Sequence, residues 1–283
     1  MKAYFYLVFI LGSLFCSAIG NGQELSVMTY NIRLDVASDG ENAWPNRKDY
    51  LVSQIQFYAP DIFGTQEGLP HQIQYLNSSL SNYNVIGEGR RGGDKGEYSA
   101  IYYNENKFKV EKQNTFWLSL TPNEVSKSWD AALPRICTYA LFTNNQTQMK
   151  FWVFNTHFDH IGVESRLQSV KLILKKIDLE NTKNYPVIFM GDLNVTPESI
   201  LITNLKRQMN DSKAVTTGST FGPTGTFNGF QFSKPVNKRI DYIFVSKTKN
   251  IKVKKYAVLS DSKDLKYPSD HLPVYVELVV NKE

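Results

Sequence analysis

Short apolar runs alternate with amphipathic stretches and turn clusters along the chain from Leu25 onward. The apolar runs are rich in β-branched and aromatic residues and are bounded by turn residues, a pattern that predicts strands. The predicted strands cover residues 25–30, 61–65, 99–103, 136–142, 151–155, 187–190, 240–245 and 274–280. Helical spacing of apolar residues predicts helices over residues 47–57, 70–80, 163–179 and 199–209.

The order of these elements indicates an α/β fold. Helices come too rarely between successive strands, above all in the second half, for a regular parallel barrel. Packed sheets flanked by helices suit the pattern better. We find no internal repeat or Pro/Ser-rich linker, so we expect one domain over residues 23–283, at the upper end of the size for a single core.

The first 22 residues have the pattern of a secretory signal peptide. Lys2 precedes an apolar stretch over residues 4–15, and the small residues Ser17, Ala18 and Gly20 follow. The stretch is short for a membrane span, so cleavage is favoured over an uncleaved N-terminal anchor. We therefore expect a secreted or periplasmic protein.

Composition, charge and cysteine content narrow the class of protein further. The 283 residues are 42% hydrophobic and 21% charged, which excludes disordered and fibrous chains. The net charge of +5 tolerates an anionic substrate without the concentrated basic stripe of a dedicated nucleic-acid binder. Cleavage of the leader removes Cys16, which leaves Cys137 without an intrachain partner; its apolar neighbours predict a buried, inert thiol.

Acidic, amide and imidazole side chains stand at the ends of the predicted strands. Each alone is more often a turn residue than a functional one, but together they form an ordered set. Its members are Asn31, Glu67, His157, Asp159, Asp192, Asn194, Asp241, Asp270 and His271. Several carboxylates gathered at one sheet edge need a cation or protons to coexist, and oxygen ligands suit Mg²⁺, with Mn²⁺ as the alternative.

Other catalytic signatures are absent from the sequence. There is no paired-cysteine or His-Glu-x-x-His zinc pattern, no phosphate-binding P-loop and no Gly-x-Ser-x-Gly elbow. The glycines between residues 87 and 96 predict a flexible turn that carries Arg90 and Arg91.

Six motifs, in order, resemble those of the endonuclease/exonuclease/phosphatase superfamily. They are Met28-Thr29-Tyr30-Asn31, Gln66-Glu67-Gly68, Thr156-His157-Phe158-Asp159-His160, Gly191-Asp192-Leu193-Asn194, Arg239-Ile240-Asp241-Tyr242 and Ser269-Asp270-His271-Leu272-Pro273. The resemblance implies a four-layer α/β sandwich, in which two mainly antiparallel β-sheets pack face to face with helices on the outside. It also implies a metal-dependent phosphoester hydrolase.

The resemblance also assigns roles to the metal ligands and the catalytic groups. Glu67 is implied as the principal metal ligand, with Asn31 beside it and Asp270 in support.

Asp192 is implied to activate the attacking water, and Asn194 and His157 to contact phosphate oxygens. His271 is implied to contact the phosphate while Asp241 orients its ring.

Substrate-side roles follow more loosely from the same resemblance. Arg135 corresponds to a phosphate-binding arginine, and Glu97 and Tyr98 to an acid and aromatic pair on the substrate side. Asp159 and Arg166 resemble positions in secreted bacterial members and, more faintly, in the deadenylase-like branch.

The favoured function is a nuclease-type phosphodiesterase that uses direct attack by an activated water. The alternatives are a sugar or inositol phosphatase, a sphingomyelinase-like enzyme with an apolar hairpin at residues 226–232, an inactive binding module on the same fold, and a carbohydrate-binding domain. A phosphoester substrate is the expected partner; no stable protein partner is inferred, and we expect a monomer.

Overall fold

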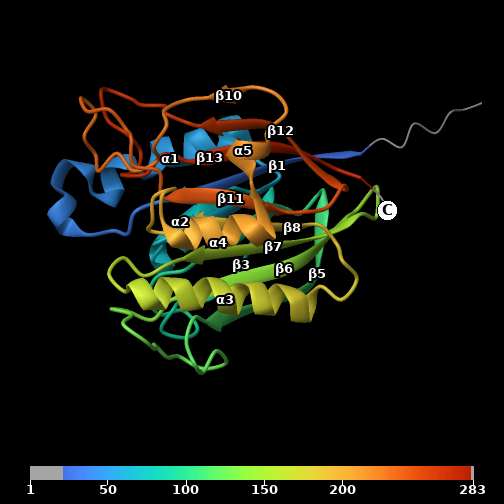
Figure 1. Ribbon diagram of the computed structural model, residues 1–283. Coiled ribbons are helices and arrows are strands. Elements are labelled where there is room, and N and C mark those ends of the chain that lie inside the picture. Colours follow the sequence, from blue (N-terminus) through green and yellow to red (C-terminus); the bar gives the residue numbers. More distant parts are fainter. Residues whose placement is uncertain (1–21, 282–283) are drawn as a thin grey trace, which may run out of the picture.

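Two β-sheets stack face to face and carry helices on their outer sides in the computed structural model, which describes residues 22–281 (Figure 1). The predicted leader lies outside the described residues except for Gly22. The first sheet has the order β10-β12-β13-β1-β2-β4-β3. Its strands are β1 (Gln23–Asn31), β2 (Ile62–Gln66), β3 (Tyr83–Ile86), β4 (Ile101–Asn104), β10 (Thr220–Phe221), β12 (Ile251–Val258) and β13 (Val274–Val280).

The second sheet has the order β5-β6-β7-β8-β11-β9. Its strands are β5 (Phe108–Trp117), β6 (Ile136–Asn144), β7 (Lys150–His157), β8 (Val187–Asp192), β9 (Met209–Asp211) and β11 (Asp241–Ser246). The helices are η1 (Ala37–Asn42), α1 (Trp44–Tyr58), α2 (Pro70–Ser79), α3 (Val163–Glu180), α4 (Ile200–Gln208) and α5 (Ser212–Val215).

Most neighbouring strands are antiparallel, and the exceptions position the site. β1 and β2 are parallel in the first sheet, and β7 and β8 are parallel in the second; β10 and β12 form a third, peripheral parallel pair. Parallel strands carry their C-terminal residues to the same sheet edge. The predicted fold class, two mainly antiparallel sheets with outer helices, is confirmed.

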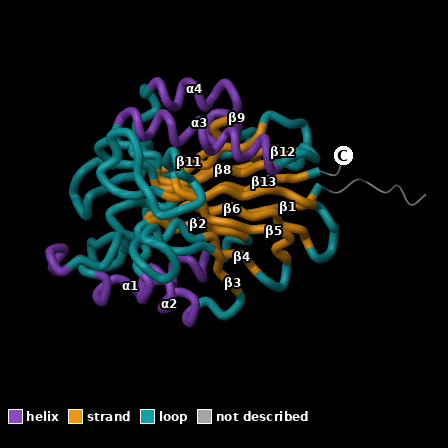
Figure 2. Tube along the Cα trace, turned by 90° about the horizontal axis from the view of Figure 1, so that it is seen from below, coloured by secondary structure: helices purple, strands orange, loops and turns teal. Residues whose placement is uncertain are grey.

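Three buried hydrophobic clusters make the sandwich. The cluster between the sheets includes Val27 and Ile62 from the first sheet and Phe142 and Ile188 from the second. A second cluster lies between the second sheet and helices α3 and α4, and a third lies between the first sheet and helices α1 and α2. Figure 2 shows the helices on two opposite sides of the strands, with many loops gathered at the end away from the C-terminus.

All eight predicted strands and all four predicted helices are present, but five strands were not predicted. The long strand β5 forms an edge of its sheet and exposes most of its middle residues, so its hydrophobic signal is weak. A bulge between Val253 and Lys255 interrupts the alternation of β12. The remaining three, β3, β9 and β10, have two to four residues each, too few for a periodic pattern.

Cys137 is fully buried in β6, and burial raises the pKa of its thiol, as expected for an inert cysteine. Within residues 22–281, no helix combines the length and the apolar character that crossing a membrane requires.

Candidate active site

Strand register brings the predicted site residues together. Asn31, the last residue of β1, pairs with Gln66 on β2, so the next residue, Glu67, lies beside it. In the second sheet, His157 at the end of β7 pairs with Asp192 at the end of β8. Asp241, the first residue of β11, pairs with Asp192 from the other side. The ends of β1, β2, β7 and β8 and the start of β11, five strand termini, therefore converge on one end of the sandwich.

Buried amide groups connect the two sheets immediately below this cluster. Gln66 Nε2 donates to Asn155 Oδ1 over 2.7 Å, and Asn155 Nδ2 donates to the carbonyls of Thr65 and Ala100 over 2.9 and 2.8 Å. Gly64 makes the approach possible, because a Cβ at that position would lie 2.7 Å from Asn155 Oδ1. Complete burial strengthens these contacts, which fix the spacing of the sheets at the site.

Asn31 bridges the two sheets within the site itself. Its Nδ2 donates to Glu67 Oε1 over 3.0 Å and to Asp192 Oδ2 over 3.1 Å. Its Oδ1 already accepts the backbone N–H of Arg33 over 3.0 Å. The geometry therefore makes Asn31 a link between two carboxylates, and its role as a metal ligand, which the resemblance implied, stays a prediction.

Glu67 and Asp270 present carboxylates next to the Arg33 guanidinium. Arg33 NH1 lies 3.9 Å from Glu67 Oε2, and Arg33 Nε lies 3.9 Å from Asp270 Oδ2. Asp39 holds this guanidinium through two contacts of 2.8 and 2.9 Å. Burial, together with the charge of Glu67, raises the pKa of Asp270. A divalent cation would relieve this repulsion, so the two carboxylates fit a hard metal ion such as Mg²⁺.

Asp192 lies between two imidazoles. Its Oδ2 is 3.6 Å from His157 Nε2 and 3.8 Å from His271 Nε2. Burial, reinforced by the negative charge of Asp241, raises the pKa of Asp192 to about 7. Its carboxyl group is therefore poised to exchange a proton near neutral pH.

Asp241 holds the His271 ring in place. Its Oδ2 lies 2.9 Å from His271 Nδ1, and Thr226 Oγ1 accepts its backbone N–H over 3.1 Å. Burial alone would lower the pKa of His271, but Asp241, followed by Asp192 and Asp270, raises it to about 10. By contrast, burial and then the charge of Arg135 hold the pKa of His157 well below its usual range.

A second arrangement of metal-binding groups lies in the same cluster. Asp192, Asp241 and His271 are buried, and one oxygen or nitrogen atom from each lies within 4.8 Å of the others. A histidine must lose its proton to bind a metal, whereas the pKa of His271 is about 10. A cation at this group would have to displace that proton, whereas the resemblance implies the pair of Glu67 and Asp270 as the cation ligands.

The pKa of His271 gives a direct prediction for the metal-free protein. We expect its ring to carry both protons at pH 8, while the ring of His157 is neutral. Because the pKa is raised above the unfolded value of about 6.5, the Asp241–His271 pair stabilises the fold below that pH, and this contribution is lost as pH rises through about 10. Imidazole NMR signals across a pH titration measure both rings.

The same titration of Asp241→Asn should show a lower pKa for His271, since the largest opposing charge is gone. An unchanged value would contradict the assigned ion pair. His271→Gln assigns the resonance.

Asn194 has a positive φ of 52° and turns its amide toward His157. Its Nδ2 lies 3.1 Å from His157 Nε2 and donates to the carbonyl of Phe158 over 3.0 Å. Its backbone N–H donates to Asp192 Oδ1 over 2.9 Å. Asn194, His157 and Asp192 thus lie together, as their predicted roles require.

Asp159 is buried, and protein donors occupy both of its oxygens. Oδ1 accepts the N–H groups of Ile161 and Gly162, and Oδ2 accepts from the 132–133 backbone and from Arg135 Nε. Burial opposes ionisation, yet the backbone N–H groups lower the pKa of Asp159 to about 2. Asp159 therefore organises two loops and aligns Arg135, and protein donors already occupy the oxygens to which the resemblance gave a substrate-side role. Arg166 NH1 donates to the Asp159 carbonyl over 2.8 Å and acts in the same way.

We expect Asp159→Ala to lower the free energy of unfolding by about 3–5 kcal/mol, because it leaves the buried Arg135 guanidinium without its carboxylate. Urea denaturation measures the change. Asp178→Ala, an exposed site on α3, is the matched control and should change stability by less than about 0.5 kcal/mol. A similarly small effect of Asp159→Ala would contradict the assignment.

Glu97 and Tyr98 lie beside the site, but their side chains have different surroundings. Tyr98 donates its hydroxyl to Asp94 Oδ1 over 2.8 Å, and its ring belongs to the outer hydrophobic cluster of the first sheet. Glu97 forms an ion pair with Arg90. Both residues line a small cavity with Arg135 and His157.

Two arginines of the site were not predicted as functional. Arg33 lies two residues after the end of the first motif. Its positive charge close to acidic residues was the feature of the sequence that could have identified it as part of the site. Arg90 was placed in a flexible turn, but backbone hydrogen bonds across the turn, such as Arg91 N–H to the Lys95 carbonyl over 2.9 Å, tie it together. The glycines permit this turn, since Gly92, Gly93 and Gly96 have positive φ.

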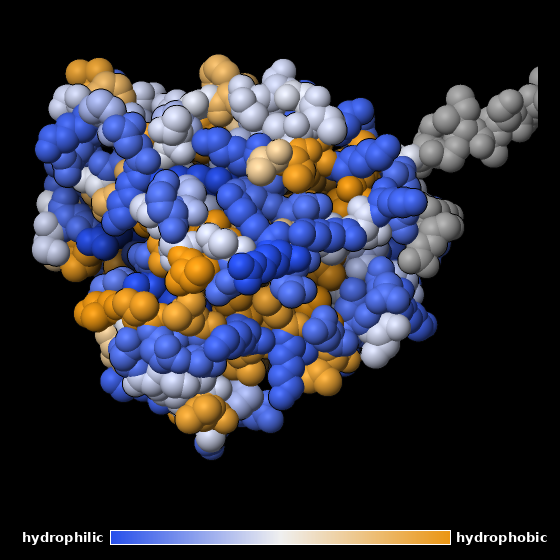
Figure 3. Space-filling model, viewed as in Figure 1, coloured by the Kyte–Doolittle hydropathy of each residue, from blue (hydrophilic) through white to orange (hydrophobic). Residues whose placement is uncertain are grey.

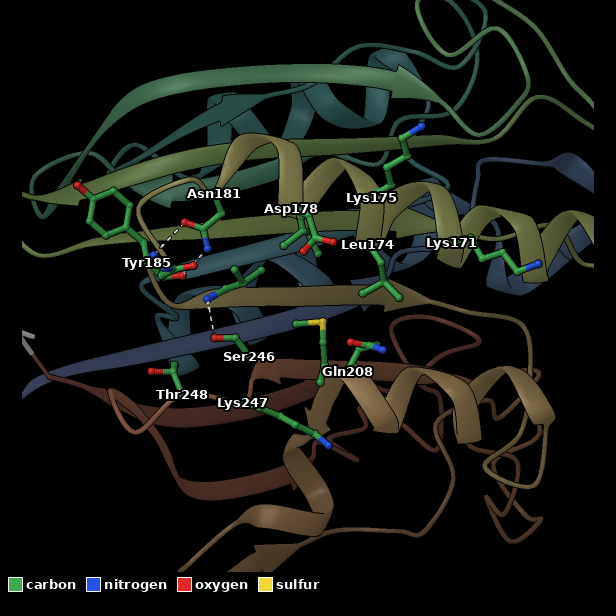
Figure 4. Close-up of a pocket in the computed structure, with 14 residues that line it drawn as sticks. Lys171, Leu174, Lys175, Asp178, Asn181, Tyr185, Gln208, Ser246, Lys247 and Thr248 are labelled. Carbon is green, nitrogen blue, oxygen red and sulfur yellow. Dashed lines mark hydrogen bonds between the residues drawn. The ribbon is translucent and has the colours of Figure 1, made fainter.

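A separate groove of about 720 Å³ lies between α3 and α4 (Figure 4). Its apolar floor includes Leu174, Val187 and Met209, and its rim includes Lys171 and Lys247. Figure 3 shows hydrophobic patches among hydrophilic residues on this face. Because Val187 begins β8 and the site residue Asp192 ends it, the groove lies at the opposite end of the strand.

The two-sheet sandwich with acids and imidazoles gathered at one end defines an α/β protein of the phosphoester-hydrolase class. The model of the Endonuclease/Exonuclease/phosphatase family matches residues 28–271, and the chain belongs to this family. The predicted membership of the endonuclease/exonuclease/phosphatase superfamily is thereby confirmed.

Similar solved structures cover nearly the whole chain. An endonuclease/exonuclease/phosphatase family protein from Bacteroides thetaiotaomicron is 37% identical, with 92% of this chain and 99% of that chain covered and a TM-score of 0.87. A mannosyl-6-phosphatase from Bacteroides thetaiotaomicron VPI-5482 is 39% identical, with coverages of 90% and 99% and a TM-score of 0.85. An uncharacterized protein of Acanthamoeba polyphaga mimivirus is 32% identical over 185 residues, 62% of this chain and 68% of that protein.

Proposed function

We propose that this protein is a metal-dependent phosphatase that removes phosphate from a phosphorylated sugar by direct attack of water. The observation that carries the reaction is the position of Asp192, a carboxyl group with a pKa of about 7 between two imidazoles. Asn31 also joins it to Glu67, the predicted metal ligand. The 39% identity to a mannosyl-6-phosphatase supports a sugar phosphate as the substrate.

In this proposal each group has one task. Asp192 orients the water and accepts its proton as the new P–O bond forms; the P–O bond to the sugar breaks, and the sugar oxygen takes a proton from solvent and leaves as the alcohol. His271, held as a cation by Asp241, donates to a phosphate oxygen, and His157 and Asn194 contact another. Glu67 and Asp270 would hold a divalent cation, which supplies charge neutralisation at the phosphate when bound. These preorganised groups stabilise the charge that develops in the transition state.

The nuclease-type diesterase activity favoured by the sequence stays a prediction, and so does secretion. We propose that the leader is cleaved near Gln23 and that the mature chain acts outside the cytoplasm, on the basis of the N-terminal sequence pattern. N-terminal sequencing of the protein exported from its native cells tests the cleavage.

Hydrolysis by the chain from Gln23 onward tests the proposed activity. The substrates are mannose 6-phosphate, p-nitrophenyl phosphate, bis-p-nitrophenyl phosphate and a single-stranded oligonucleotide, each with Mg²⁺, Mn²⁺ or EDTA. We expect release of phosphate from the monoesters that EDTA abolishes and added metal restores. Cleavage of the diester or oligonucleotide at a higher kcat/KM would overturn the monoesterase proposal in favour of the nuclease prediction. Full activity in EDTA would overturn the metal dependence.

A further inference from the structure

Arg33 places a positive charge next to both carboxylates of the proposed cation site. Its NH1 lies 3.9 Å from Glu67 Oε2, and its Nε lies 3.9 Å from Asp270 Oδ2. Both distances exceed the length of a hydrogen bond, so the attraction is between charges. The side chains of Glu67 and Asp270 are only 12% and 10% exposed, and salt screens charges in such positions weakly. Arg33 therefore neutralises part of the charge of this pair.

The backbone of Arg33 is held in a conformation that residues other than glycine rarely adopt. Its φ is 55°, in the left-handed region. Asn31 Oδ1 accepts its backbone N–H over 3.0 Å, and its carbonyl accepts from Arg47 NH2 over 2.7 Å and from Gln72 Nε2 over 3.0 Å. The neighbouring Glu67 also has a positive φ, of 66°. Such conformations persist where the surrounding contacts impose them, and they cluster at functional sites.

Asp39 fixes the orientation of the Arg33 guanidinium. Its Oδ2 accepts from Arg33 Nε over 2.9 Å, and its Oδ1 accepts from Arg33 NH2 over 2.8 Å. Two parallel hydrogen bonds of this kind define the plane of a guanidinium as well as its position. The positive charge is therefore held beside Glu67 and Asp270 by contacts to a third carboxylate.

A cation bound by Glu67 and Asp270 would lie close to this fixed positive charge. Because like charges a few ångströms apart repel each other, the guanidinium opposes the binding of a cation. In the absence of a cation, the same charge offsets the repulsion between the two carboxylates and keeps them in place. Arg33 therefore acts on the site in both of its states.

We propose that Arg33 is a positioning residue of the cation site, which serves as the resident counter-ion of Glu67 and Asp270 and lowers the affinity of the site for a divalent cation. This inference rests on the proposed metal-dependent phosphatase function and extends it to how tightly the cation is held. A cation opposed in this way exchanges more readily than one held by the same two carboxylates without the arginine.

Binding of Mn²⁺, measured by electron paramagnetic resonance, tests the inference without reference to turnover. Arg33→Gln should bind Mn²⁺ about 10- to 100-fold more tightly than wild type, the order expected when one like charge a few ångströms away is removed. Arg33→Lys keeps the positive charge and should return the affinity to within about threefold of wild type. Lys247→Gln removes the same charge from an exposed position beyond the far end of β11 and should leave the affinity unchanged.

Asp39→Asn separates the effect of the charge from a change in the loop. This variant weakens the same contacts to the guanidinium but leaves the charge of Arg33 in place. We expect it to bind Mn²⁺ no more tightly than wild type. If it tightens binding as much as Arg33→Gln does, loosening of the loop is the cause and the inference is wrong.

Thermal unfolding with and without Mn²⁺ gives a second measure. A ligand that binds the folded state more tightly stabilises it more, so the rise in Tm on addition of Mn²⁺ should be larger in Arg33→Gln than in wild type. The same curves check that each variant folds. Arg33→Asn, whose side chain tolerates a positive φ, replaces Arg33→Gln if the latter does not fold.

The outcomes distinguish the inference from the proposed function. Unchanged or weaker Mn²⁺ binding in Arg33→Gln, together with the expected loss of affinity in Glu67→Gln, overturns the inference and leaves the metal-dependent phosphatase intact. If wild type does not bind Mn²⁺, or binds it no more tightly than Glu67→Gln, the proposed cation site fails, and the inference fails with it.

Discussion

Replacing Asp192 by asparagine is expected to lower kcat for phosphomonoester hydrolysis by about 10²- to 10⁴-fold, the range for loss of a general base. An amide cannot accept a proton from water at neutral pH, whereas the Asp192 carboxyl, with a pKa of about 7, can. The substitution preserves the shape of the side chain, so the fold should be retained. Steady-state kinetics with saturating Mg²⁺ measure the effect, and circular dichroism confirms folding.

Asp178→Asn is the control for this substitution. Asp178 is exposed on α3 and lines the groove at the far end of the second sheet, away from the site. Its kinetics should equal those of wild type. If Asp192→Asn keeps more than about a tenth of the wild-type kcat, another group must accept the proton and the proposed mechanism is wrong.

Replacing Glu67 by glutamine is the second substitution with a large expected effect. The neutral amide keeps one oxygen, which can accept from only one of the two N–H donors, Asn31 Nδ2 and Leu34 N, that now bond to Oε1 and Oε2 respectively. The negative charge at the proposed cation site is lost, however. We expect metal affinity to fall by more than the roughly 10- to 100-fold that loss of an outer hydrogen-bonding partner costs metal sites. Electron paramagnetic resonance of Mn²⁺ measures binding without reference to turnover.

Glu124→Gln, an exposed change in the loop after β5, is the matched control for Mn²⁺ binding. If Glu67→Gln binds Mn²⁺ as tightly as wild type, the cation lies elsewhere. The group of Asp192, Asp241 and His271 would then be the site to test, and Asp241→Asn should weaken binding in its place.

The convergence of the site could be predicted because its residues stand at strand ends. Asn31, Asp192 and Asp241 occupy the first or last position of a strand, and strand pairing leaves few ways to arrange such positions. The apolar runs identify those strands, and the order of the polar residues after them identifies the family. Eight strands and four helices were therefore predicted correctly.

What each side chain contacts could not be predicted in the same way. Asp159 has the residue type of a substrate-binding group, yet it turns inward because four backbone N–H groups converge on it from residues 132–133 and 161–162. The ion pair of Arg90 with Glu97 depends on the path of a glycine-rich turn, which hydrophobic periodicity does not report. The amide of Asn31 could have faced a metal or a carboxylate, and its direction depends on the Arg33 N–H.

The Gln66–Asn155 hydrogen bond joins the two β-sheets directly beneath the candidate active site. Glu67 follows a strand of the first sheet and Asp192 ends a strand of the second. A displacement of one sheet along the other by the length of one strand residue, about 3.3 Å, would therefore separate the two carboxylates. Under pressure or mild denaturant, we therefore expect activity to be lost when the two sheets shift relative to each other, before the protein unfolds.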